Sequence, residues 1–175
     1  MKINLSVTSY QLSAYRRGFT LVETLVAITI LLVSIVGPYY IAAKGLFSAN
    51  VARDQVTAYY LAQEPIEYSR NLRDQNGLRG LPWLTGLDNC LSGNTCYVDV
   101  PNGTIGLCSG TCPVIKLDTS THLYNYLTGN NSIFTRSTAI TTINEHEVAI
   151  SVSVSWLAGT ISRSFVIREN IFDWQ

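Results

Sequence analysis

The feature that most constrains this chain is an uncharged, apolar stretch near its start. From Thr24 to Ala43 there is no Asp, Glu, Lys or Arg. A helix of this length rises about 30 Å, which matches the hydrocarbon core of a bilayer. A buried core helix is the alternative, but a fully apolar stretch this long is rare in a small soluble domain. The stretch therefore predicts one membrane-spanning helix.

The residues before this stretch indicate its orientation. Lys2, Arg16 and Arg17 are basic, and no acidic residue occurs as far as Gly18. Positive charge before an apolar span holds that end of the chain in the cytoplasm. An ordinary secretory signal would show a small-residue cleavage site after a shorter apolar region. Here the change in character comes before the apolar region, at Gly18 and Phe19.

The run RRGFTLVETLVAITIL, which starts at Arg16, resembles the N-terminal cleavage and methylation motif of type IV pilins and pseudopilins. The resemblance implies that a prepilin peptidase cuts after Gly18 and methylates the new amine of Phe19. It identifies Glu23 as the acidic residue of the motif. It implies, as further partners, other pilin or pseudopilin subunits, an inner-membrane assembly platform and membrane lipid. The expected location is the inner membrane, single-pass, with the head periplasmic or extracellular, and then a surface or periplasmic filament.

The chemistry of each motif residue fits these roles. Gly18 has no side chain, so a protease can approach its carbonyl. A charged residue near the centre of a membrane helix costs about 3 kcal/mol, less near an end, and such residues usually mark function. The amine of Phe19 would be cationic at neutral pH. It lies too close in sequence to pair well with Glu23 of its own helix, so a neighbouring subunit's amine is the expected partner. The alternative is that Glu23 only favours the positive end of the helix dipole.

The membrane helix is expected to continue into an amphipathic half, from about Thr20 to Arg73. Apolar residues recur there at spacings of three and four. They are Ala52, Val56, Tyr59, Ala62 and Ile66. Pro38 and Pro65 lie inside this helix and predict kinks, with a bend near Leu61 to Pro65. The expected segments are a cytoplasmic leader that is removed (1–18), the membrane half of the helix (19–43), its soluble half (44–74) and a loop-rich β head (75–175).

The head is expected to contain short strands followed by a meander. Short strands are predicted at 97–100, 104–107 and 114–117, the first two joined as a hairpin. Alternating apolar residues predict longer strands at 134–142, 148–156 and 161–167. The apolar face of these strands needs a cover, which the soluble half of the helix supplies. The prediction is an α+β fold: a long N-terminal helix packed on a small antiparallel sheet, as in pilins.

Four cysteines lie in the middle of the head: Cys90, Cys96, Cys108 and Cys112. A head outside the cytoplasm lies where disulfides persist, and the spacings do not match a zinc site, so two disulfides are expected. If the hairpin closes as predicted, Cys96 would lie opposite Cys108, and Cys90 could meet Cys112. The local pairing, Cys90 with Cys96 and Cys108 with Cys112, remains open.

The sequence indicates a structural role. The formal net charge is zero, so no general attraction to nucleic acid is expected. The two histidines, His122 and His146, have no ligands at persuasive spacings, so no metal, cofactor or catalytic site is predicted, and the chain is not expected to be an enzyme. The prediction is a minor pilin or pseudopilin of a type IV pilus, type II secretion or DNA-uptake filament. The alternative is a pilus-tip adhesin or substrate-binding module on the same anchor, with an exposed apolar or aromatic patch on the head.

Overall fold

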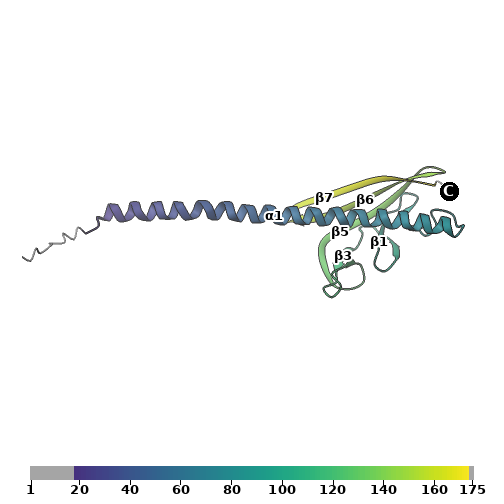
Figure 1. Ribbon diagram of the computed structural model, residues 1–175, viewed down its shortest axis with the longest axis horizontal. Helices are drawn as coiled ribbons and strands as arrows, with labels where there is room; N and C mark the ends of the chain where they lie inside the picture. Colours follow the sequence, from purple (N-terminus) through teal and green to yellow (C-terminus); the bar gives the residue numbers. More distant parts are fainter. Residues whose placement is uncertain (1–17, 174–175) are drawn as a thin grey trace, which may run out of the picture. The chain divides into compact units, whose positions relative to one another are not determined.

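The computed structural model describes residues 18–173, so Arg16 and Arg17 lie outside the described residues. The chain separates into two compact units, Met1–Phe47 and Ser48–Gln175. One helix, α1, runs from Leu21 to Leu78. The strands that follow it are β1 (Cys96–Asp99), β2 (Thr104–Leu107), β3 (Val114–Leu117), β4 (Tyr124–Asn125), β5 (Asn130–Asn144), β6 (Glu147–Ala158) and β7 (Ile161–Phe172), with a short 3₁₀ helix, η1 (Asp88–Cys90), before β1 (Figure 1).

In the described part of the first unit, residues 18–47, the chain is almost wholly the apolar part of α1, and these side chains are all exposed. The threonine and serine hydroxyls within this part of the helix donate to its own backbone: that of Thr24 to the carbonyl of Leu21, and that of Ser34 to the carbonyl of Leu31. Such bonds satisfy hydroxyl hydrogens that would have no hydrogen-bond acceptor in lipid. In the described part of the chain, α1 is long and apolar enough to cross a membrane.

The residues that the second half of α1 buries differ in part from the apolar residues expected on its covered face. Ala62 and Ile66 are buried as expected, whereas Ala52, Val56 and Tyr59 are exposed. The buried positions are Ala58, Leu61, Ala62, Pro65, Ile66, Ser69, Arg73 and Asn76. The prediction was wrong for the three exposed residues because apolar residues occur on more than one face here, and the sheet covers the face that starts at Ala58.

Neither proline ends the helix. The helix continues through Pro38 and Pro65 and ends at Leu78, five residues beyond the expected Arg73. Asn76 helps to fix this end, because its side-chain amide donates to the carbonyls of Trp83 and Thr85. The kinks expected at the two prolines remain predictions.

Pro65 lacks the amide hydrogen that would normally bond the carbonyl of Leu61, four residues earlier. That carbonyl instead accepts a hydrogen bond of 2.7 Å from the guanidinium of Arg136 on β5. The same guanidinium donates to the carbonyl of Val98 on β1 at 2.6 Å and to the carboxylate of Glu64 at 2.7 Å. Only 1% of the Arg136 side chain is exposed. One buried arginine therefore joins α1, β1 and β5 at the residue where the proline interrupts the helical bonds.

The sheet is antiparallel and is organised around β5. Strands β5, β6 and β7 form the predicted meander, with Ile140 opposite Ile150 and Val152 opposite Ile167. β5 also pairs with β1 and β3, which carry β2 and β4 as their outer neighbours. The hairpin of β1 and β2 and the strand β3 were predicted, whereas the two-residue β4 and the short η1 were not. The result is the predicted α+β, pilin-like fold, a long apolar helix packed on a curled antiparallel sheet.

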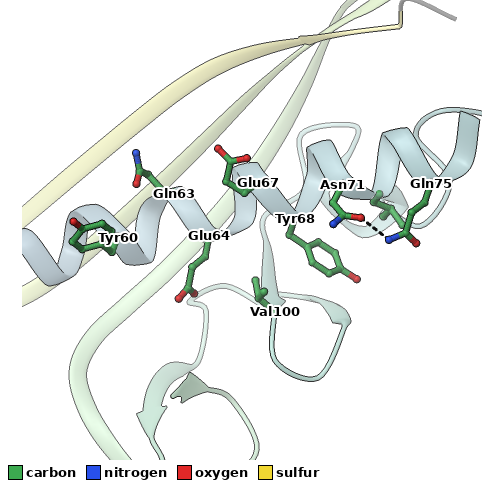
Figure 2. Close-up of a pocket in the computed structure, with 9 residues that line it drawn as sticks. Tyr60, Gln63, Glu64, Glu67, Tyr68, Asn71, Gln75 and Val100 are labelled. Carbon is green, nitrogen blue, oxygen red and sulfur yellow. Dashed lines mark hydrogen bonds between the residues drawn. The ribbon is translucent and has the colours of Figure 1, made fainter. Parts of the chain in front are cut away.

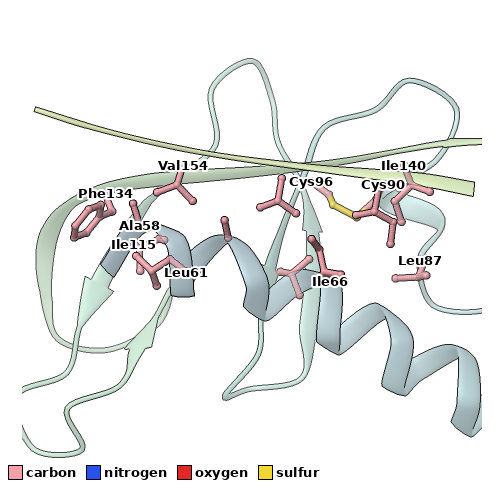
Figure 3. Packing of buried hydrophobic residues seen from close by; sticks show 14 of the residues in the cluster. Ala58, Leu61, Ile66, Leu87, Cys90, Cys96, Ile115, Phe134, Ile140 and Val154 are labelled. Atoms are coloured by element: carbon pink, nitrogen blue, oxygen red, sulfur yellow. A yellow bond between two sulfur atoms is a disulfide. The ribbon is translucent and has the colours of Figure 1, made fainter. Parts of the chain in front are cut away.

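The core lies between the second half of α1 and the inner face of the sheet. Figure 3 shows Ala58, Leu61 and Ile66 of the helix beside Phe134 and Val154 of the strands. Every second residue of β6 is buried, from Val148 to Ala158. This burial matches the alternation in the sequence, because successive side chains of a strand point to opposite faces.

The four cysteines form the local disulfides, Cys90–Cys96 and Cys108–Cys112, with Cα atoms 5.0 and 4.8 Å apart. The hairpin explains why the cross-hairpin pairing does not occur. Cys96 lies opposite Leu107, so Cys108 is displaced by one residue. A shift of one residue turns a side chain to the other face of a strand pair.

Candidate processing and assembly site

The predicted cleavage point lies just before the helix. Gly18, Phe19 and Thr20 are exposed and non-helical, and α1 begins at Leu21. A Cβ atom placed on Gly18 would meet no neighbouring atom within 4 Å. Phe19 is 78% exposed. No residue that the structure describes therefore blocks the approach of another protein to the peptide bond between Gly18 and Phe19.

Thr20 caps the start of the helix. Its hydroxyl accepts a hydrogen bond of 3.2 Å from the backbone N–H of Glu23. This bond satisfies one of the amide groups that every helix leaves unpaired at its N-terminus. This cap was not predicted, although Thr20-Leu21-Val22-Glu23 has the pattern of a capping box, Thr followed three residues later by Glu.

Glu23 lies in the first turn of α1 with its side chain exposed. Between Gly18 and Asp173 it forms no ion pair, and Lys44 is the first basic residue that follows it in the sequence. Its position suits the positive end of the helix dipole. The carboxylate is also free to meet a cation from another molecule, because the cap bond uses only the backbone N–H of Glu23.

The uncharged, apolar surface of α1 continues from this site. The side chains of residues 24–43 are exposed and apolar apart from the hydroxyls of Thr, Ser and Tyr, and Pro38 is one of these residues. Tyr40 and Lys44 mark the far end, where the Lys44 ammonium lies 4.7 Å from the centre of the Tyr40 ring. An aromatic ring beside a lysine is typical of the boundary between the hydrocarbon and the polar region of a bilayer.

A family model of the prokaryotic N-terminal methylation motif matches residues 13–37. The chain carries the type IV prepilin-type signal. The matched region includes Gly18, Phe19, Thr20 and Glu23, whose arrangement is described above. No curated protein and no solved structure matches the chain. Together with the fold, the motif supports a type IV pilin-like protein with a membrane-anchored N-terminal helix.

The head of this pilin-like protein also has an open groove (Figure 2). It has a volume of about 520 Å³ and lies along one side of α1, facing Val100. Two tyrosines, Tyr60 and Tyr68, alternate there with polar side chains. These are Gln63, Glu64, Glu67, Asn71 and Gln75. No group of three His, Cys, Asp or Glu side chains that could hold a metal occurs within residues 18–173.

Proposed function

We propose that this pilin-like chain is a minor pilin or pseudopilin, a structural and assembly subunit of a type IV pilus, type II secretion or DNA-uptake filament. The observation that carries the proposal is the methylation motif at residues 13–37, which overlaps the uncharged stretch of α1, a helix long and apolar enough to span a bilayer. The disulfide-bonded head fits a compartment outside the cytoplasm. The partners proposed are a prepilin peptidase, other pilin subunits and an inner-membrane assembly platform.

In this proposal the mature protein begins at Phe19 with a methylated amine. The openness of Gly18 supports it, because a peptidase must reach the carbonyl of this residue. The test is mass spectrometry of the N-terminus from cells that contain the peptidase. Gly18→Leu should leave the leader attached. Gly45→Leu, which also changes an unobstructed glycine, is the matched control and should be processed normally.

Glu23 has the assembly role in this proposal. Its carboxylate would pair with the Phe19 amine of a neighbouring subunit, shifted along the filament axis. Supporting this pairing, Glu23 has no ion pair among residues 18–173 and every processed subunit supplies one such amine. Pairing would remove two unpaired charges from an apolar setting, and breaking one side of such a pair would leave the other charge stranded.

Glu23→Ala and Glu23→Gln test this role. Both variants should insert, lose the leader and form their disulfides, while the amount of subunit in sheared filaments falls relative to the amount in the membrane. Thr20→Ala is the control, because it removes the helix cap and keeps the charge, so it should assemble normally. Normal assembly of both Glu23 variants would refute the pairing. Loss of cleavage would show instead that the peptidase reads Glu23.

A second candidate is a binding module at a filament tip that uses the same anchor. The groove along α1 favours it, since Tyr60 is 62% exposed beside polar side chains that could orient a ligand. This function predicts that Tyr60→Ala abolishes attachment of filament-bearing cells to a target surface without lowering incorporation of the subunit. Equal loss of attachment and incorporation would favour the purely structural role.

A further inference from the structure

Strand β7 leaves one edge of the sheet open. Within residues 18–173, β7 pairs with β6 along its whole length, from Ile161 to Phe172, and with no other strand. Figure 1 shows β7 as the outermost strand of the meander. The other outer strands, β2 and β4, have only four and two residues. A long open edge presents unpaired N–H and C=O groups, which are the groups that another extended chain can bond.

An apolar hollow adjoins this edge. It has a volume of about 450 Å³ and lies between α1 and Phe165 of β7. Three of the helix side chains that line it, Ala52, Val56 and Tyr59, belong to the apolar set that was expected to be buried. The lining residues from the helix are Ala52, Gln55, Val56, Tyr59 and Tyr60. Val56 is 55% exposed. A second hollow, between the helix and Ile167, shares Tyr59 with the first. Apolar side chains beside an open edge can receive alternate side chains of an added strand.

The charges along β7 indicate what kind of strand would fit. Arg163 and Arg168 are exposed and make no ion pair with any residue between Gly18 and Asp173. The acid on this strand, Glu169, is already paired with Arg70 of α1, which also pairs with Glu67. The two unpaired charges on β7 are therefore both positive.

We propose that β7 receives an acidic, extended segment of another polypeptide, which adds a strand to the sheet and fills the adjoining hollow. Backbone hydrogen bonds to β7 would supply affinity, and alternate apolar side chains would enter the hollow beside Phe165 and Val56. Arg163 and Arg168 are five residues apart, so they lie on opposite faces of the strand. The partner would carry one carboxylate on each face.

A second copy of β7 is a poorer occupant. Pairing two copies would bring four arginines onto one pair of strands, and like charges across a strand pair are destabilising. The same charges favour an acidic partner and make its binding depend on salt. The inference does not depend on the filament role, because it rests only on the head.

The test uses the full-length chain in detergent micelles and a fluorescent peptide of about ten residues, the upper end of the usual range of strand lengths. The peptide alternates Val and Thr and carries two Glu residues five positions apart. Fluorescence anisotropy should show binding that weakens about tenfold in the double variant Arg163→Glu, Arg168→Glu and weakens with added salt. Hydrogen exchange at the amides of β7 should slow when the peptide binds.

Arg79→Glu is the matched control, since it reverses an exposed charge outside β7 and should leave binding unchanged. A peptide with Lys in place of Glu should bind more weakly, and one with a central Pro should not slow exchange in β7. The proposal is overturned by absence of binding, by binding that ignores the charge reversal, or by slowed exchange elsewhere than in β7. It is also overturned if the β7 amides become protected without peptide as the protein concentration rises, which would identify a second copy as the occupant.

Discussion

Because Arg136 donates a hydrogen bond to the carbonyl of Leu61, we predict that the effects of substituting Arg136 and Pro65 on stability are coupled. Pro65 removes the helical donor for this carbonyl, and Arg136, 71 positions later, replaces it. The contribution of Arg136 to the free energy of unfolding should therefore depend on the residue at position 65. In Pro65→Ala, the new backbone N–H can donate to Leu61, so the arginine becomes partly redundant.

The magnitude follows from the number of groups left unpaired. Arg136→Met strands the carbonyls of Leu61 and Val98, and each buried unpaired polar group costs about 1–3 kcal/mol. Part of this loss is offset because a buried guanidinium is itself expensive to desolvate. We therefore expect a net loss of about 2–5 kcal/mol. In the Pro65→Ala background only the carbonyl of Val98 is stranded, so the loss should be smaller by about 1–3 kcal/mol.

Guanidinium denaturation of the full-length chain in micelles measures this coupling. Tryptophan fluorescence reports on the head, because Trp83, Trp156 and Trp174 all follow α1 in the sequence. The four proteins of the cycle are wild type, Pro65→Ala, Arg136→Met and the double variant. Arg70→Met is the control: it also removes an arginine that pairs with a glutamate across α1 and the sheet, but this one is partly exposed, so the loss should be below about 1 kcal/mol.

The coupling would be refuted if the changes in the free energy of unfolding of the two single variants added up to that of the double variant. Distant, independent sites add within about 0.5 kcal/mol, so coupling below that value would mean that Arg136 does not substitute for the missing helical donor. The stability change of Pro65→Ala alone does not decide the matter. That single substitution combines a restored backbone bond with the loss of a buried ring, and only the cycle separates the two effects.

Three further predictions concern the head. Peptide mapping without reduction should recover Cys90–Cys96 and Cys108–Cys112, and replacing either pair by serine should cost about 2 kcal/mol because each closes a short loop. Ala62→Leu should destabilise the head by about 1–3 kcal/mol through overpacking, whereas Ala52→Leu should be nearly neutral, since Ala62 is buried and Ala52 is exposed. Burial raises the pKa of Tyr126, which favours its neutral form in the folded state; its contribution should therefore be present below about pH 10 and be lost as the pH rises through the folded pKa. Unfolding midpoints measured from neutral to strongly alkaline pH should fall less steeply in Tyr126→Phe.

The sequence predicted the elements whose side chains follow a clear period. The meander was recognisable because apolar residues occupy every second position from Val148 to Trp156, and the structure buries them. The apolar part of α1 was recognisable from the absence of charge. In both cases one physical requirement, a buried face or a lipid-facing surface, acts on many residues at once.

Where the sequence predicted wrongly or left alternatives open, it offered a choice between similar patterns. Around Ala58 the helix has apolar residues on two adjacent faces, and nothing local says which one the sheet covers. The disulfide pairing depended on a displacement of one residue between Cys96 and Cys108, which a residue count does not resolve. The role of Arg136 had a weak signal, because a charged residue at an inward position of an alternating strand requires buried partners. Its partner Leu61 is 75 residues away and is not recognisable from sequence.

The site at the start of α1 combines a local and a non-local requirement. The local one is satisfied within the chain, because Thr20 accepts from the N–H of Glu23 and so caps the helix without using the carboxylate. The carboxylate is left exposed at the end of an uncharged surface, where no basic residue before Lys44 follows it. The helix cap does not require an acid here, since Thr20 already provides the cap. In the proposed function, the charge of Glu23 has a partner from outside the chain: the amine that cleavage after Gly18 would leave on Phe19 of another copy, which has the opposite charge.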